Sequence, residues 1–354
     1  MKRISCLGIF FALLFIIGLT QNCAKKSVGS LGPYDEITLV ADPADYELFK
    51  TELSAVFEKE VETPLPEKIF VINQVTPEEF TKLRRRRNIV LVSTLESQGE
   101  TIELIKGMLP ASEVPKVEQG QSFFFQKKDP WAYNQMLLVL VANNTETLKQ
   151  KLLSSNDQLF NIFDERLTRL VKSEVFGEGE QKILAKNLQE KYGWSIRIQH
   201  DYQIFEEDEQ NNYVLLLRDY PKRWICVAWY DTNDPSLMTN EWCINFRNEI
   251  FSYMKGKEII DEKHTRVDTV EFYGKYALNL VGLYGGEDED GWPKVYGGPF
   301  RSYFVYVEED NRIYMVDYAI FAPDRDKKTY LRQLDIIANT FNTTKNKTEK
   351  VAQK

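Results

Sequence analysis

An uncharged apolar run near the amino terminus separates a short leader from a long polar body. Residues 7–19 carry no charge and follow Lys2 and Arg3, and Cys23 comes shortly after the run. A basic start followed by about 7–15 apolar residues is typical of a secretory signal, whereas a helix that spans a membrane needs about 20. The sequence therefore predicts that residues 1–22 are a signal peptide and that the remainder folds as a water-soluble body.

Cys23 is predicted to be the lipid-modified first residue of a mature bacterial lipoprotein. The residues before it, Thr20-Gln21-Asn22, match the usual lipoprotein signal only in part, so an uncleaved amphiphilic anchor and ordinary signal removal are alternatives. Each buried CH₂ of an acyl chain contributes about 0.8 kcal/mol, so more than one chain makes attachment stable. Ala24-Lys25-Lys26 contains no acidic residue. By resemblance to lipoprotein sorting signals, this favours the outer membrane, facing the periplasm.

The composition is that of a folded protein. Hydrophobic residues make up 43% of the 354 and charged residues 28%, which is typical of globular domains, and the length favours two of them. The net charge of −8 argues against a general nucleic-acid surface. We therefore expect a membrane partner through the acyl chains, with an envelope protein or glycan as a further partner, and neither nucleic acid nor a cofactor.

The chain is predicted to divide into six parts by its composition and periodicity. The segment after Cys23 is rich in Lys, Ser and Gly and has too few apolar residues to pack, so it is predicted to be a tether. After the signal peptide, the parts expected are a lipidated tether (23–35), an N-terminal α/β domain (36–176), a connecting helix (177–193), a C-terminal α+β domain (194–342) and a polar tail (343–354).

Apolar periodicity predicts an α+β protein of two domains, each with a mixed or antiparallel sheet and helices packed on it. Thr76 and Glu79 have the spacing of a capping box at the start of a helix. The strands expected are 36–41, 68–73, 88–94, 122–126 and 135–142 in the first domain, and 195–198, 213–218, 224–230, 270–276, 277–284, 303–307 and 313–321 in the second. The main helices expected begin at 43, 76, 102 and 144 in the first domain, and span 237–254 and 329–341 in the second.

Three segments resemble a known family. RRRRNIVLV (84–92), GGPF (297–300) and YLRQLDII (330–337) are similar to an uncharacterised bacterial lipoprotein family, domain of unknown function 4837, over most of the mature chain. This resemblance implies a periplasm-facing lipoprotein without an assigned activity. The second domain also resembles the α/β sandwich of PsbP-type proteins, which implies an accessory or binding module.

Arg84, Arg85, Arg86 and Arg87 form the densest cluster of positive charge. Guanidinium groups bind anions in pairs, so the cluster is a candidate site for phosphate, a lipid headgroup or an acidic glycan. The alternative is structural, because cations are favoured at the carboxyl end of a helix and a buried strand follows.

A second candidate site is an aromatic loop. Trp292, Tyr296 and Phe300, with Arg301 beside them, could form a platform for a sugar or a peptide. Aromatic side chains more often pack in the core, and that is the alternative for these three.

The cysteines and histidines suggest little chemistry. Cys226 and Cys243 could form a disulfide in an oxidising compartment or remain two small buried thiols. His200 and His264 have neither metal-ligand spacing nor a nucleophile motif nearby, so we expect surface histidines, no metal site and no catalytic residue.

The favoured function is therefore a binding or scaffolding module of the cell envelope. A periplasmic hydrolase that uses two carboxyl groups is the alternative, and a structural partner of an outer-membrane complex is a third hypothesis. A hydrolase should have a concave pocket with two acidic groups of different pKa, and a binding module should have a groove without them.

Overall fold

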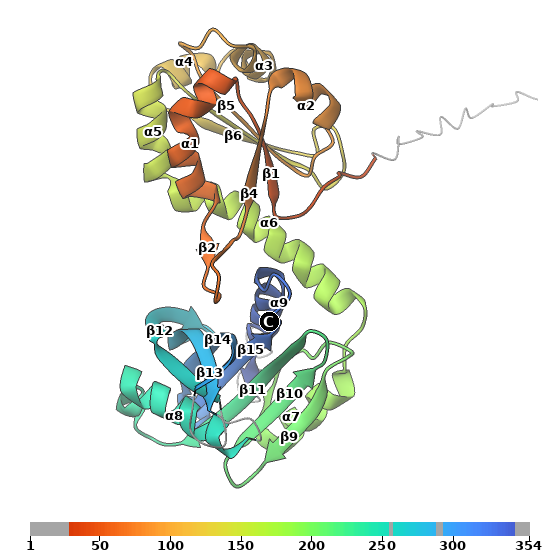
Figure 1. Cartoon of the computed structure of the whole chain (residues 1–354), viewed down its shortest axis with the longest axis vertical. Helices are drawn as coiled ribbons and strands as arrows, with labels where there is room; N and C mark the ends of the chain where they lie inside the picture. Colours follow the sequence, from red (N-terminus) through yellow and green to blue (C-terminus); the bar gives the residue numbers. More distant parts are fainter. Residues whose placement is uncertain (1–27, 255–257, 288–292, 344–354) are drawn as a thin grey trace, which may run out of the picture.

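Two sheets organise the residues described by the computed structural model, which are 28–254, 258–287 and 293–343. The first sheet has five strands in the order β4-β1-β5-β7-β6, and the second has seven in the order β12-β13-β14-β15-β11-β10-β9. The two sheets belong to different halves of the chain, and the helix α6 (Asn156–Gly177) runs from the first towards the second (Figure 1). The expected α+β class with two sheet-and-helix regions is confirmed.

The first sheet is parallel except at one edge, where β6 runs antiparallel to β7. Every residue of β5 and β7 is buried, because helices cover both faces of the sheet. The apolar run at 88–94 therefore forms the expected buried strand. The strands are β1 (Glu36–Val40), β4 (Val71–Val75), β5 (Asn88–Thr94), β6 (Phe124–Lys128) and β7 (Met136–Ala142).

Helices pack on each face of this first sheet. One face is covered by α1 (Pro43–Phe57), α5 (Thr145–Ser154) and α6, and the other by α2 (Pro77–Leu83), α3 (Glu100–Met108) and α4 (Val114–Glu118). The predicted capping box starts α2: the Thr76 hydroxyl accepts from the Glu79 amide at 3.3 Å, and the Glu79 carboxylate accepts from the Thr76 amide at 2.9 Å. The single long helical region expected from residue 144 is instead two helices that meet at Ser155.

The second sheet is antiparallel and lies between helices. The helix α8 (Asn240–Tyr253) covers one face, and α7 (Lys182–Tyr192) and α9 (Lys328–Ala338) contribute to the core on the other. The short strands β8 (Trp194–Ser195) and β16 (Asn342–Thr343) pair with each other. The long strands are β9 (Gln203–Asp208), β10 (Tyr213–Arg218), β11 (Lys222–Asp231), β12 (Glu258–Phe272), β13 (Lys275–Glu287), β14 (Pro293–Val307) and β15 (Arg312–Phe321).

The bounds predicted for several strands of this domain were wrong. The polar stretch before residue 270 is part of β12, an edge strand whose side chains are largely exposed, so apolar alternation is weak there. The strand expected at 270–276 ends at Phe272, because Tyr273 and Gly274 both have positive φ and turn the chain into β13. The strand expected at 195–198 is reduced to β8, and β9 was not predicted.

One apolar core connects the two domains. Side chains from α1 and α6 on the first sheet, and from α9 on the second, belong to a single cluster of buried residues. Phe163 of α6 and Leu334 of α9 are 1% and 0% exposed. The domains are therefore packed together through apolar contacts.

A buried ion pair lies on the opposite side of the second sheet, under α8. Arg247 Nε donates to Asp317 Oδ2 at 2.7 Å, and both side chains are fully buried. The Ser302 hydroxyl donates to the same oxygen at 2.5 Å. The rings of Phe251 and Phe300 lie 4.3 and 3.9 Å from the guanidinium carbon. Because unpaired buried charges are costly, this arrangement fixes how α8 packs on the sheet.

Glu258 adds a second carboxyl group, 4.0 Å from Arg247. Burial raises the pKa of Glu258 to about 8, whereas an unfolded Glu has a pKa of about 4.3. The folded state therefore retains a proton that the unfolded state has lost. The resulting stability is fully present below about pH 4.3 and is lost as pH rises through about 8.

We predict that Glu258→Gln removes this part of the pH dependence. The free energy of unfolding in urea, measured from pH 4.5 to pH 9, should fall less with pH in Glu258→Gln than in the wild type. Glu262→Gln, an exposed position of the same strand, is the control and should follow the wild type. If the free energy of unfolding depends on pH equally in Glu258→Gln and in the wild type, the assignment of this pH dependence to Glu258 is wrong.

Candidate functional site

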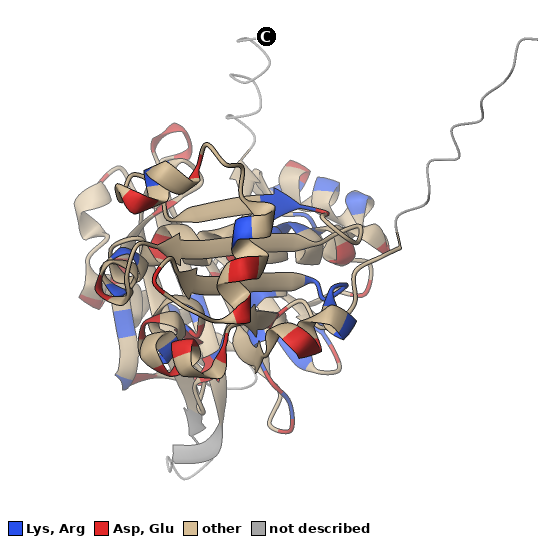
Figure 2. Ribbon diagram, turned by 90° about the horizontal axis from the view of Figure 1, so that it is seen from above, with Lys and Arg blue, Asp and Glu red and all other residues tan. Residues whose placement is uncertain are grey.

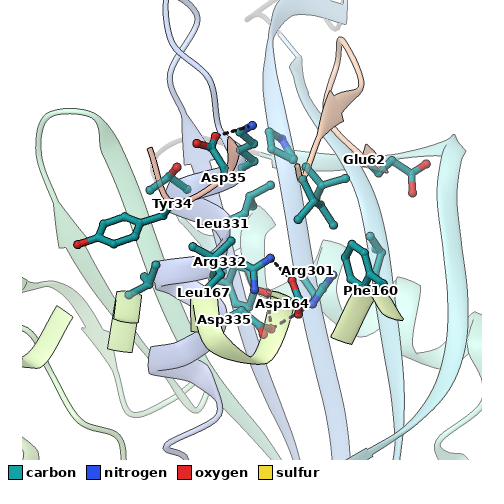
Figure 3. Close-up of a pocket in the computed structure, with 18 of the residues that line it drawn as sticks. Tyr34, Asp35, Glu62, Phe160, Asp164, Leu167, Arg301, Leu331, Arg332 and Asp335 are labelled. Carbon is teal, nitrogen blue, oxygen red and sulfur yellow. Dashed lines mark hydrogen bonds and ion pairs between the residues drawn. The ribbon is translucent and has the colours of Figure 1, made fainter. Parts of the chain in front are cut away.

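A cavity of about 460 Å³ lies between the two domains (Figure 3). The first domain contributes α6, the segment 33–35 and residues of the loop that contains β2 (Glu60–Val61) and β3 (Glu67–Lys68). The second contributes β13, β14, β15 and α9. A volume of several hundred Å³ is typical of sites for small molecules, which often lie at domain interfaces.

Much of the wall is apolar. The apolar side chains come from both domains, so neither domain alone would form this surface. They include Val61, Ile69, Phe160, Leu167, Val171, Val281 and Leu331.

The polar part of the cavity is centred on Asp335 of α9. Its Oδ1 accepts from Arg301 Nη1 at 3.1 Å, from Tyr303 Oη at 2.6 Å and from Tyr318 Oη at 2.7 Å. Burial raises the pKa of Tyr303 to about 12 and also raises that of Tyr318. Both phenols therefore keep their protons at neutral pH and act as donors, so Asp335 is held by three groups of the second sheet.

Two further ion pairs join the domains across the cavity. Arg332 of α9 donates to Asp164 at 2.6 Å and to the Thr168 hydroxyl at 2.7 Å, both on α6. Lys328 Nζ lies 2.8 Å from Asp35 Oδ2. Figure 3 shows Arg332 and Asp164 beside Arg301 and Asp335, whereas Asp35 lies apart from this group.

The first domain also caps a helix of the second. The carboxylate of Glu67 on β3 accepts from the amide of Lys327 at 2.8 and 2.9 Å and from the amide of Lys328 at 2.9 Å. These amides belong to the first turn of α9, where backbone N–H groups have no partner within the helix. A carboxylate at this end is also favoured by the helix dipole. The cap therefore fixes α9, and with it one wall of the cavity.

This arrangement suits binding better than acid–base catalysis. Asp35, Asp164 and Asp335 each hold an ion pair, and Glu62 at the cavity edge pairs with Arg266. Glu174 also lines the cavity, and it accepts a hydrogen bond from Tyr34. The cavity thus offers an apolar surface beside four ion-paired carboxylates.

The predicted aromatic platform lies partly outside the described residues. Trp292 lies outside the described residues, and Tyr296 is described only as part of the backbone of β14. Phe300 and Arg301 are neighbours in one strand and point to opposite faces of the sheet. The Phe300 ring packs in the core beneath α8, whereas the Arg301 side chain reaches Asp335 in the cavity. Phe300 and Arg301 both line the cavity, so the structure places these two of the four at the candidate site.

The predicted arginine cluster divides into two pairs. Arg86 lies 3.7 Å from Glu36, and Arg87 donates to the Gly32 carbonyl at 3.2 Å and stacks over Tyr34. These two contacts hold the N-terminal segment against the first sheet. Arg84 and Arg85 are exposed beyond the carboxyl end of α2, so anion binding by them stays a prediction.

The remaining candidates lie elsewhere. Cys226 and Cys243 are buried free thiols in the core between the second sheet and α8, so they do not form a disulfide here.

His200 and His264 are exposed, and His264 Nδ1 lies 2.7 Å from Asp261. Cys23 is outside the described residues. Among residues 28–254, 258–287 and 293–343, no group of three or more His, Cys, Asp or Glu could hold a metal ion.

The described helices include none that is long and apolar enough to cross a membrane.

Sequence reasoning missed the charged face of α9. Lys328, Arg332 and Asp335 follow one another at spacings of four and three, which places them on one side of a helix. Charged residues at that spacing usually indicate a solvated face. Here all three line the cavity: Lys328 and Arg332 pair with the first domain, and Asp335 accepts from the second sheet. The spacing alone does not contain this information.

We predict that Glu67→Ala destabilises the protein by about 0.5–2 kcal/mol, the usual effect of removing a helix cap. Urea unfolding measures the loss, and Glu60→Ala on the exposed side of the same hairpin is the matched control. Equal stability of the two variants would show that Glu67 does not hold α9.

The two halves of the chain match different families. Residues 181–340 match a domain of unknown function, DUF4837, and residues 30–175 match a second domain of unknown function, DUF8532. No curated protein shows significant sequence similarity to the chain.

Three solved structures give distant matches to part of the chain. A mutant of the protein Mog1 is 12% identical with a TM-score of 0.30, and the Saccharomyces cerevisiae Ran-binding protein Mog1p is 9% identical with a TM-score of 0.29. Each match covers 43% of this chain and 90% of the other. LpqN of Mycobacterium tuberculosis, involved in cell envelope biogenesis, is 12% identical with a TM-score of 0.28, covering 43% of this chain and 83% of the other. Scores this low carry no conclusion about function.

The family match confirms the resemblance and narrows its extent. The segments at 297–300 and 330–337 lie inside the matched region, whereas 84–92 lies in the half that matches DUF8532. Residues 181–340 are thus similar to the family of domain of unknown function 4837.

Proposed function

We propose that this protein is a lipid-anchored module of the cell envelope that binds a small amphipathic molecule between its two domains. The observation that carries the binding role is the cavity of about 460 Å³ with walls from both domains. Its apolar side chains would contact the apolar part of the ligand. The polar end of the cavity, around Asp335 and Arg332, would bind the headgroup of the ligand through hydrogen bonds to these ion-paired side chains.

The geometry favours this role over a carboxylate hydrolase. A two-carboxyl mechanism needs one group that keeps a proton and one that is free to act as base or nucleophile. Asp164 and Asp335 are both engaged by guanidinium groups, at 2.6 and 3.1 Å. Holding charges in pairs lowers the electrostatic penalty of placing an uncharged or zwitterionic ligand beside them.

The envelope location is supported by the leader. The basic start, the short apolar run and Cys23 are the features of a lipoprotein signal, and the described body begins only five residues after Cys23. We propose an anchor in the outer membrane, with the body facing the periplasm. The partner in this account is the lipid bilayer, reached through the acyl chains of Cys23.

We predict that filling the cavity abolishes binding. Val171→Phe places a larger side chain on the α6 wall, which should weaken binding of the fluorescent probe anilinonaphthalene sulfonate about tenfold or more, equivalent to about 1.4 kcal/mol. Lys172→Phe, an exposed neighbour outside the cavity lining, is the matched control. Native mass spectrometry of protein purified from cells gives a second readout. Probe binding that is equal in both variants would place binding outside this cavity.

We predict that Cys23→Ala moves the protein from the membrane fraction to the soluble fraction, because the acylated thiol is removed. Cys243→Ala keeps Cys23 and should stay with the membrane. Mass spectrometry of the mature amino terminus should find the acyl chains on Cys23 in the wild type. An unmodified thiol, or an intact leader, would contradict the anchor.

A further inference from the structure

The described chain begins beside exposed basic residues. Leu31 donates its amide to the Arg85 carbonyl at 2.8 Å, and the Arg85 side chain donates back to the Gly29 carbonyl at 3.0 Å. Arg84 and Arg85 are exposed, and within the described part of the chain neither forms an ion pair. The N-terminal segment therefore leaves the body of the protein next to two unneutralised guanidinium groups.

A second basic pair lies at the same end of the first sheet. Lys127 and Lys128 are exposed at the carboxyl end of the edge strand β6. Lys128 pairs with Met136 of β7, and Met136 pairs with Asn88, the first residue of β5. Asn88 directly follows the arginine cluster, so both basic pairs are at one edge of the domain. Figure 2 shows Lys and Arg segments gathered near the start of the described chain.

Acidic residues do not cancel this charge. Asp129 follows Lys128 and is exposed, and its single negative charge offsets only one of the four exposed basic residues. Glu36 faces Arg86, which is not one of the four exposed basic residues. This edge therefore has a net positive charge, although the formal net charge of the whole protein is −8.

Large apolar side chains are exposed between the basic pairs. Val28, Leu31 and Tyr133 are 57%, 54% and 57% exposed. Backbone hydrogen bonds hold them together: Tyr133 donates to Val28 at 3.0 Å and accepts from Ser30 at 2.9 Å. Tyrosine and aliphatic side chains flanked by Lys and Arg are typical of surfaces that enter the headgroup region of a bilayer.

The length of the tether limits where this face can be. Gly29 is six residues from Cys23, and a fully extended chain spans at most about 3.6 Å per residue. Gly29 and the Arg85 side chain bound to it can therefore lie no more than about 22 Å from the Cys23 backbone. A tether at about half of this span brings the basic residues to roughly the 10 Å over which a charged surface acts.

We propose that this basic–apolar face, made of Arg84, Arg85, Lys127 and Lys128 around Val28, Leu31 and Tyr133, binds an anionic phospholipid surface. The inference rests on the proposed anchor at Cys23, which brings the face to a bilayer. Binding would hold the first domain at a fixed orientation on the membrane. The phosphate groups of the lipids would pair with the guanidinium and ammonium groups, and Tyr133 would enter the headgroup layer.

The test uses the unacylated full-length variant Cys23→Ala, so that the acyl chains do not contribute. Its sedimentation with vesicles of phosphatidylcholine containing phosphatidylglycerol is compared with sedimentation on phosphatidylcholine alone. Each basic residue near an anionic surface is worth about a fivefold change in partitioning. Adding Arg84→Gln, Arg85→Gln, Lys127→Gln and Lys128→Gln should therefore lower binding to the anionic vesicles at least tenfold at low salt.

The matched control has the same change in net charge. It carries Lys172→Gln, Lys182→Gln, Lys186→Gln and Lys263→Gln, all exposed and away from this face, and should bind like the parent. Equal loss in both variants would show a general charge effect and overturn the proposal, as would binding that does not depend on the anionic lipid. Absence of acyl chains from the wild-type protein would contradict the proposed anchor at Cys23. Binding of the unacylated variant through these residues would still support the proposed basic–apolar face.

Discussion

The packing of α9 against the first domain is the contact on which the rest of the structure depends. It buries apolar side chains in the cluster that also contains α1 and α6, and it places Arg332 against Asp164. Burial of apolar surface supplies most of the favourable free energy, whereas the ion pair chiefly fixes orientation. Because α9 also packs on the second sheet, one helix determines how the two domains meet.

The charges at this interface are arranged so that few are left alone. Asp335 receives three donors from the second sheet, while Lys328 and Arg332 each reach a carboxylate of the first domain. Paired charges can line a cavity without the large desolvation penalty of isolated ones. Because these carboxylates are already engaged by cations, the cavity is better suited to holding a molecule than to cleaving one.

The N-terminal segment has a second role in this arrangement. Tyr34 lies under the guanidinium of Arg87, and the carboxylate of Glu174 on α6 raises the pKa of Tyr34 by accepting its hydrogen bond. Asp35 then reaches Lys328 in the other domain. The end of the segment that composition describes as a tether thus has defined contacts, and it links the arginine cluster of the first domain to the wall of the cavity.

Local patterns in the sequence determined the buried strand β5, the capping box at Thr76 and the alternation of helices with strands, because each signal involves residues close together in the chain. The similarity of residues 181–340 to domain of unknown function 4837 also followed from short segments. The cap of α9 by Glu67 joins residues 260 positions apart, and no periodicity reports such a contact. Only the tertiary structure could separate Phe300 from Arg301 and bring Arg301 to Asp335, because the face that each side chain takes is set by strand register and by what packs on the sheet.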